Sequence, residues 1–223
     1  MAFRIVKKSI IDNILAPNQK DLFRVAGHAP PELGAEAVLN NKRLVSVYYQ
    51  DGDFSRGAIT RPNHEMTFHI DMMIAADSKV DLLVLEKEFE NGEIQKEAYA
   101  DSLSELKAAE NNADAIMDEL FNIVYQLIMD KRNQRLGVDR FDPPVNLPIS
   151  NRMIRKFEKG STMPKGNLVM LGGQATLTCR ADEKLIGAGA VGELNAGAEF
   201  WHTFEVNEDA VTKAGVLATT RTD

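Results

Sequence analysis

A glycine-rich segment, Gly187–Gly192, carries the most suggestive motif in this 223-residue chain, because it matches G-x-G-x-x-G letter for letter. In dinucleotide-binding folds such glycines follow a strand and open a helix, so that the backbone can approach a pyrophosphate. Here the preceding Asp182-Glu183-Lys184 is polar, and the following Glu193–Gly197 is a poor helix former. We therefore interpret the segment as a loop of small residues and keep nucleotide binding as an alternative.

Two histidines and an aspartate lie close together in the sequence between residues 64 and 71. A zinc-protease motif requires two histidines four residues apart on a helix, whereas His64 and His69 are five apart. The residues around them alternate with a period of two, which predicts a strand with the two histidines on opposite faces. Asp71 shares a face with His69, but a His–Asp pair indicates catalysis only beside a Ser or Cys nucleophile. We predict a structural or surface role for both histidines.

The remaining candidates are one cysteine and a pair of aspartates. Cys179 falls where the alternation predicts burial, and no neighbour in the sequence would stabilise its thiolate. Asp51 and Asp53 could bind a cation, although a turn is the commoner use of such residues. The sequence has neither a G-x-S-x-G elbow nor a Walker loop. We therefore predict a protein that is not an enzyme, with no catalytic residue, metal ligand or cofactor.

The elements that would position these residues predict an α+β fold. Met66–Ala76 and Asn167–Ala181 alternate apolar and polar residues, and Arg43–Tyr49 is rich in β-branched and aromatic residues, so all three are predicted strands. Apolar residues at helical spacing predict helices over Phe3–Leu15 and Asn112–Asp130. We expect a mixed or antiparallel β-sheet flanked by an N-terminal helix and a long amphipathic helix.

The segments between these elements are predicted from turn and breaker residues. We expect a turn at Asp51-Gly52-Asp53, a loop over Ser55–Asn63 and a short helix over Asn151–Phe157. Val80–Glu88 fits either a strand or a helix. A further strand is predicted at Phe200–Val206, near the C-terminus.

The composition is that of an ordinary globular protein, with 44% hydrophobic and 26% charged residues. The formal net charge of −7 argues against a sequence-independent grip on nucleic acid, but would let DNA pass without sticking. A single cysteine excludes an intrachain disulfide, and no apolar run approaches the roughly 18 residues that span a bilayer. We expect no membrane association, synthesis in a cytoplasm, and two parts: an α+β domain over residues 1–181 and a C-terminal extension or arm over residues 182–223.

The order of the predicted elements resembles that of the tail terminator proteins of tailed bacteriophages, also called tail-completion or neck proteins. In that family an N-terminal helix precedes a strand of the type seen in RLVSVYYQD, and a longer alternating strand ends in a short turn, as in MTFHIDMMIAADS. A long amphipathic helix ends near a Leu-Gly, here Leu136-Gly137, and a closing strand follows a lysine-glycine loop, here Lys165-Gly166. The resemblance covers residues 1–181 in element order.

The resemblance implies a structural virion protein of the tail or neck that forms a ring, expected to be a homohexamer, at the head-proximal end of the tail tube. Such a ring would end the tube, contact the tail tube protein and the head-completion or connector protein, and let DNA pass through its lumen without specific binding. Three features depart from the smaller members of the family: the charged segment Glu86–Glu110, the connection Asp139–Pro164 and the tail after Asp182. Two alternatives stay open, namely a cytosolic nucleotide-binding or small-molecule enzyme using Gly187–Gly192, and another head–tail connector or adaptor protein.

Overall fold

The computed structural model describes residues 2–19, 22–25, 43–58, 61–143 and 145–182. The chain divides into two units, Met1–Glu183 and Lys184–Asp223, and the described residues all belong to the first. Gly187–Gly192 and Phe200–Val206 lie outside the described residues, so the predictions made for these two segments stay predictions.

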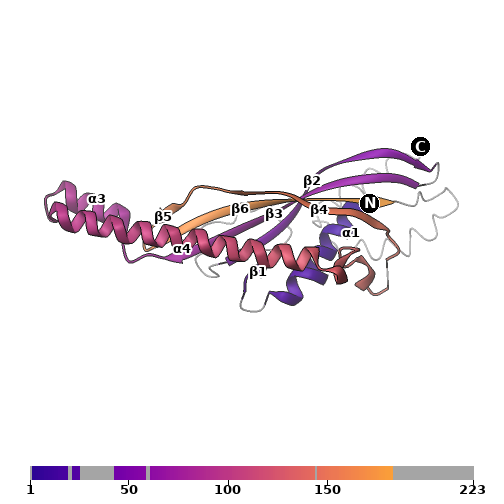
Figure 1. Ribbon diagram of the computed structural model, residues 1–223, viewed down its shortest axis with the longest axis horizontal. Helices are drawn as coiled ribbons and strands as arrows, with labels where there is room; N and C mark the ends of the chain where they lie inside the picture. Colours follow the sequence, from indigo (N-terminus) through magenta and orange to yellow (C-terminus); the bar gives the residue numbers. More distant parts are fainter. Residues whose placement is uncertain (1, 20–21, 26–42, 59–60, 144, 183–223) are drawn as a thin grey trace, which may run out of the picture. The chain divides into compact units, whose positions relative to one another are not determined.

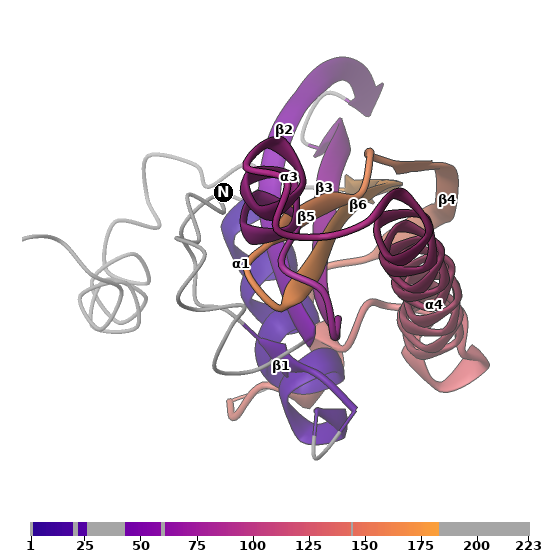
Figure 2. The same ribbon diagram turned by 90° about the vertical axis from the view of Figure 1, so that its left-hand side faces the viewer.

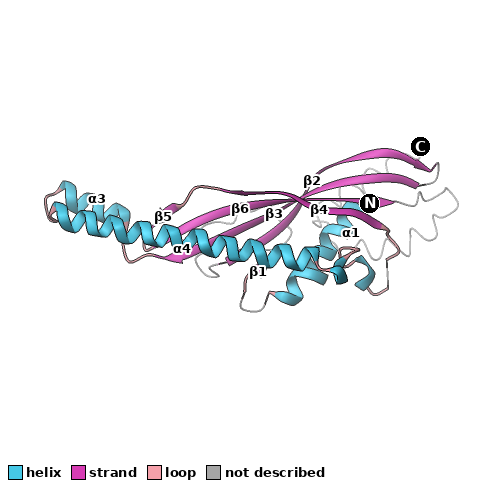
Figure 3. Cartoon of the chain, viewed as in Figure 1, coloured by secondary structure: helices cyan, strands magenta, loops and turns pink. Residues whose placement is uncertain are grey.

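One β-sheet organises the described residues (Figures 1 and 3). The strands are β1 (Arg24–Val25), β2 (Arg43–Ala58), β3 (Arg61–Asp77), β4 (Ile149–Lys159), β5 (Met163–Lys165) and β6 (Leu168–Asp182). Their order across the sheet is β1-β2-β3-β6-β4, and β5 also pairs with β6. β1 runs parallel to β2, while the other described pairings are antiparallel. The predicted α+β fold with a mixed sheet is confirmed.

The hairpin of β2 and β3 extends further than predicted. Both predicted strands are present, but β2 continues through Asp51-Gly52-Asp53, so the turn predicted there is wrong, and the loop predicted over Ser55–Asn63 is strand at both of its ends. Gly52 does not form a turn; its lack of a side chain lets the backbone of β3 and the side chain of Tyr49 lie close to it. A Cβ atom at this position would lie 2.5 Å from the carbonyl oxygen of Glu65 and 2.6 Å from Tyr49 Oη.

The predicted N-terminal helix is confirmed. α1 (Ala2–Ser9) continues into a π-helical turn, η1 (Ile10–Leu15), and then into a 3-10 turn, η2 (Ala16–Asn18). Pro17 lies in the first turn of η2, where proline is tolerated because the N–H group it lacks would have no helical partner. The apolar face of this segment points at the sheet and is fully buried at Val6, Ile10, Ile14 and Leu15.

Two helices, α3 (Leu82–Glu90) and α4 (Lys96–Met129), connect β3 to the second half of the sheet. Asp81 begins α3, because its Oδ1 accepts hydrogen bonds from the backbone N–H groups of Leu83 (3.0 Å) and Val84 (3.4 Å). α4 is one uninterrupted helix, so the helix predicted over Asn112–Asp130 is the second half of a longer one and does not begin separately at Asn112. The buried stripe of α4 runs past that position without a break, through Leu106, Ala113, Met117, Leu120, Val124 and Ile128.

Strand β4 corrects a prediction, because Asn151–Phe157 is strand and not helix. Its pairing with β6 shifts register twice, between Ser150 and Met153 and between Ile154 and Lys156. Such β-bulges add residues to one strand and so hide the period of two by which a regular strand is recognised.

The end of α4 is held by a side chain from β4. The guanidinium group of Arg152 donates hydrogen bonds to the carbonyl oxygens of Met129 (3.1 Å) and Asp130 (3.2 Å), and also to that of Asn133. The last carbonyl groups of a helix have no partner within the helix. Arg152 therefore satisfies backbone acceptors where α4 ends.

The segment after α4 docks on the N-terminal helix at Leu136-Gly137. Ser9 Oγ donates a hydrogen bond to the carbonyl oxygen of Leu136 (2.8 Å), and Asn13 Nδ2 donates one to that of Gly137 (3.0 Å). Gly137 adopts a left-handed conformation, with φ +74°. A Cβ atom there would lie 3.0 Å from Asn13 Cβ, 3.1 Å from Ser9 Oγ and 3.3 Å from Ile14 Cγ1. Both the backbone angle and the close packing therefore require glycine.

The hydrophobic core lies between the sheet and the helical layer, because α1, η1 and α4 pack on the same face of the sheet (Figure 2). Alternate residues of β3 point into this core: Met66, Phe68, Ile70, Met72 and Ile74. On β6 the same face holds Gly173, where a Cβ atom would lie 3.0 Å from Met117 Sδ and 3.1 Å from Phe157 Cε2. Its neighbour Gly172 is on the opposite face, where a Cβ atom would have nothing within 4 Å.

Candidate functional site

The sheet face opposite α1 and α4 carries the polar side chains of the strands, and we call it the polar face. The alternation that buries one set of residues in the core turns the other set to this side. The polar face comprises Ser46, Tyr48, Asp51, Asp53, Glu65, Thr67, His69, Asp71, Arg155, Lys156, Gln174, Thr176, Thr178 and Arg180.

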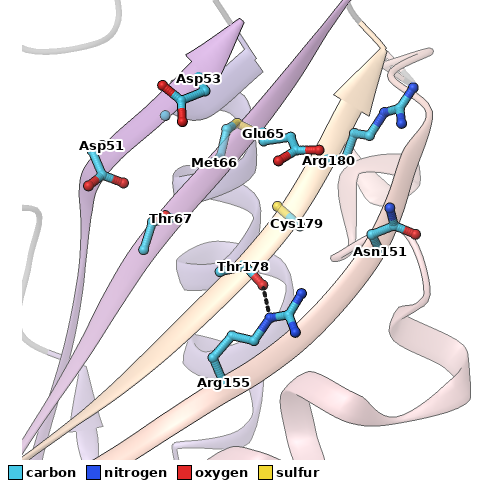
Figure 4. A pocket seen from close by; sticks show the side chains of 11 residues that line it. Asp51, Asp53, Glu65, Met66, Thr67, Asn151, Arg155, Thr178, Cys179 and Arg180 are labelled. Carbon is cyan, nitrogen blue, oxygen red and sulfur yellow. Dashed lines mark hydrogen bonds between the residues drawn. The ribbon is translucent and has the colours of Figure 1, made fainter. Parts of the chain in front are cut away.

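A groove of about 180 Å³ lies on the polar face, and its two sides have opposite charge (Figure 4). Asp51 and Asp53 from β2 and Glu65 from β3 form the acidic side. Arg155 from β4 and Arg180 from β6 form the basic side. The predicted pair of aspartates is therefore part of a larger charged arrangement and does not form a turn.

The acidic side of the groove brings like charges together. Asp53 and Glu65 are direct partners in the register of β2 and β3, and Asp51 lies on the same face of β2. Like charges directly opposite each other destabilise an antiparallel pair. Within the part of the chain that the structure describes, none of these three carboxylates forms an ion pair. Asp51, Asp53 and Glu65 are all exposed, so they can attract a positively charged group from outside.

The basic side of the groove does not neutralise the acidic side. Arg155 Nε donates a hydrogen bond to Thr178 Oγ1 (3.1 Å), and the Arg155 guanidinium has no carboxylate partner among the described residues. Arg180 is the register partner of Glu65, yet its Nε lies 3.6 Å from Asp182 Oδ1 instead. The groove thus keeps charges of both signs available for a partner.

A second polar cluster lies further along the same face. Gln174 Nε2 donates hydrogen bonds to Asp71 Oδ1 (2.8 Å) and to Tyr48 Oη (3.0 Å), and Tyr48 Oη is 2.9 Å from His69 Nδ1. Burial raises the pKa of Asp71, although the hydrogen bond from Gln174 and the nearby His69 partly offset this effect. Burial and the charge of Asp71 raise the pKa of Tyr48. The cluster links three strands through side chains.

This cluster lacks the geometry of a catalytic triad. His69 and Asp71 share a face, as predicted, but the hydrogen bonds given for them go to Tyr48 and Gln174. Ser46 on β2 is the register partner of Asp71, and its buried Oγ has no hydrogen-bond partner among the described residues. A base aligned on the hydroxyl is what activates a serine. We infer a structural role for the cluster.

The prediction that His64 and His69 lie on opposite faces is confirmed. His64 is fully buried on the core side, where Phe54 stacks on its ring with centroids 4.0 Å apart and Tyr49 Oη lies 3.3 Å from its Nε2. The predicted burial of Cys179 is also confirmed, and burial raises the pKa of its thiol to about 12. Such a thiol is protonated at neutral pH and unreactive.

Comparisons with known proteins add no relationship. A scan against protein-family models finds no match for this chain, and a search of curated proteins finds none either.

Among the described residues, no three His, Cys, Asp or Glu side chains are grouped so that they could hold a metal ion. The same residues include no helix both long enough and apolar enough to cross a membrane.

Sequence reasoning missed the basic side of the groove. Arg155 lies in the segment that was predicted to be a helix, so its position on the sheet could not be anticipated. Arg180 follows Cys179 in an alternating strand, which does place it on the polar side. The available signal was therefore the change in the sign of charge between the polar positions of two strands, from Asp51 and Asp53 on β2 to Arg180 on β6.

Proposed function

We propose that this chain is a structural virion protein of a tailed phage, a subunit of a ring that ends the tail tube and joins it to the head connector. The observation that carries the proposal is the arrangement of elements. The N-terminal helix α1 and the long helix α4 lie on one face of a sheet in which the hairpin β2–β3 is joined by the returning strand β6. These elements follow one another in the order by which the sequence resembles tail terminators, and β4 and β5 add two strands where that order has only a connection before the closing strand.

The polar face supports an assembly role. Ring closure by repeated head-to-tail contacts needs two different and complementary surfaces on each subunit, and the groove separates an acidic side from a basic side. The net charge of −7 would disfavour adhesion of DNA to a ring around it. The ring is expected to be a homohexamer that contacts the tail tube protein on one side and the head connector on the other.

Electron microscopy of the purified chain tests the proposal directly, both alone and mixed with tubes assembled from a tail tube protein. Light scattering supplies the mass of the particles in parallel. Closed rings of about six subunits, or caps at one end of each tube, are the expected result. Tubes that grow to uncontrolled length in the presence of a chain that stays monomeric would refute the proposal.

The nucleotide-binding alternative predicts a different outcome. A Gly189→Val variant should lose a nucleotide ligand if Gly187–Gly192 binds a pyrophosphate, because the added side chain would block the approach of the backbone. The ring proposal expects the same variant to cap tubes as well as the parent chain does. Calorimetric titration with nucleotides, run beside the capping assay, separates the two functions.

A further inference from the structure

We propose that copies of this chain contact each other side by side, through an acidic edge of one copy and a basic edge of the next. The acidic edge is Asp51 and Asp53 on β2, and the basic edge is Arg155 and Lys156 on β4. This inference rests on the proposed function, which supplies the ring, and it names the surfaces through which neighbouring subunits of that ring would contact each other. The partner that binds at each edge is a second copy of the same chain.

The two edges lie on opposite sides of the sheet and are offset along the strands, because Asp51 shares its row with Met153, whereas Lys156 shares its row with Tyr48. Asp51 pairs with Thr67 on β3, Thr67 pairs with Thr178 on β6, and Thr178 pairs with Met153 on β4. The described pairing of β1 with β2 involves Leu44 and Val45 and does not reach Asp51. At this level β2 and β4 are therefore the outermost strands among the described residues.

The charges on these edges have few partners among the residues that the structure describes. Asp51 and Asp53 form no ion pair with any described residue, and Arg155 has only its hydrogen bond to Thr178. Lys156 is 61% exposed and is paired with Glu158 on its own strand, at 2.6 Å. Two acidic side chains on one outer strand and two basic side chains on the other give the charge complementarity that steers two surfaces together.

The direction of the strands permits a head-to-tail arrangement. Because β2, β3, β6 and β4 alternate in direction, β2 and β4 run opposite ways. A copy rotated about a ring axis would place its β4 beside the β2 of its neighbour in an antiparallel sense. Contacts between two different patches can close into a ring. The bulges of β4 discourage continued backbone pairing, so the contact is assigned to side chains.

Charge reversal provides the test. One variant carries Asp51→Lys and Asp53→Lys, and a second carries Arg155→Glu and Lys156→Glu. Each variant alone sets like charges against each other in every contact, so we expect association to weaken by about 100-fold or more. An equimolar mixture should assemble again, because each variant then meets the complementary edge of the other. Native mass spectrometry should find equal numbers of the two variants in each restored particle.

The matched control changes the same amount of charge on a remote surface. Asp101 and Glu105 are exposed residues of α4, and a variant that carries both Asp101→Lys and Glu105→Lys should assemble as the parent chain does. Circular dichroism of every variant establishes that it is folded. Assembly of the parent chain should also weaken in about 1 M salt, where the screening length falls to about 3 Å.

The outcomes separate this inference from the proposed function. If the parent chain forms rings or caps and the two reversed variants do so equally well, the edge contact is wrong and the ring proposal stands. If the reversed variants lose association and the mixture restores it, but no particle caps a tube, the edge contact stands and the terminator function is wrong. A parent chain that stays monomeric both alone and with tubes overturns both.

Discussion

Replacing Gly137 by alanine should destabilise the fold through two separable effects. The first is backbone conformation, because alanine at φ +74° costs about 1–2 kcal/mol relative to glycine. The second is crowding, because the new Cβ would lie 3.0–3.3 Å from atoms of Asn13, Ser9 and Ile14. Inserting a methyl group into a packed site costs about 1–3 kcal/mol. The sum, about 3 kcal/mol, corresponds to a fall of about 6–12 °C in Tm.

Gly92 supplies the control that separates the two effects. Its φ of +72° nearly equals that of Gly137, but a Cβ atom there would have nothing within 4 Å. Gly92→Ala should therefore lose only the backbone term, about 1–2 kcal/mol. Urea unfolding followed by circular dichroism measures both variants against the parent, with unchanged m-values as the condition for comparing midpoints. Equal losses for the two variants would refute the argument that packing against Ser9 and Asn13 requires glycine at residue 137.

Four further predictions concern single side chains. Arg152→Met should cost about 2 kcal/mol in urea unfolding, because three carbonyl groups lose a donor. Gly173→Ala should cost about 1–3 kcal/mol through core crowding, whereas Gly172→Ala should be neutral or stabilising. The fold raises the pKa of Asp71, so ionisation of this carboxyl group opposes folding. The contribution of Asp71 to the free energy of unfolding is fully present below its unfolded pKa, and it is lost as the pH rises through the folded pKa. Asp71→Asn should therefore gain stability relative to the parent as the pH rises above about 4, the unfolded pKa of an aspartate. Cys179, with a pKa of about 12 and an exposed fraction of only 3%, should react with a thiol reagent only after unfolding.

Sequence patterns predicted the core elements because those elements are regular. The strand from Met66 to Ala76 keeps its period, as does the buried stripe of α4 from Leu106 to Ile128, so burial on one side fixes both the element and its face. Asp51-Gly52-Asp53 was misassigned because a turn and a strand with a close-packed glycine have the same local composition. The choice between them is made by pairing with β3, which is not visible in a short window of sequence.

The candidate site was harder to predict than the fold because it is assembled from four strands. The aspartates of β2 and the arginines of β4 and β6 are far apart in the sequence, and their grouping follows from the order in which the strands pair. The bulges of β4 removed the one local signal that could have placed Arg155 on the sheet. Pairing order and bulges depend on long-range contacts, which a single sequence does not display.

The polar face keeps charged side chains that do not stabilise an isolated subunit, and assembly offers a physical reason for their presence. Asp53 opposite Glu65 weakens the hairpin, and a neutral residue in place of Asp53 would remove this repulsion while leaving Glu65 opposite Arg180. A contact that brings a guanidinium or ammonium group from a neighbouring copy would turn this repulsion into attraction, and the gain would be realised only on assembly. The charges would then disfavour acid-to-acid contacts between copies while favouring acid-to-base ones. A stability cost within the subunit thus becomes specificity between subunits, and this is the physical link between the groove and the ring that we propose.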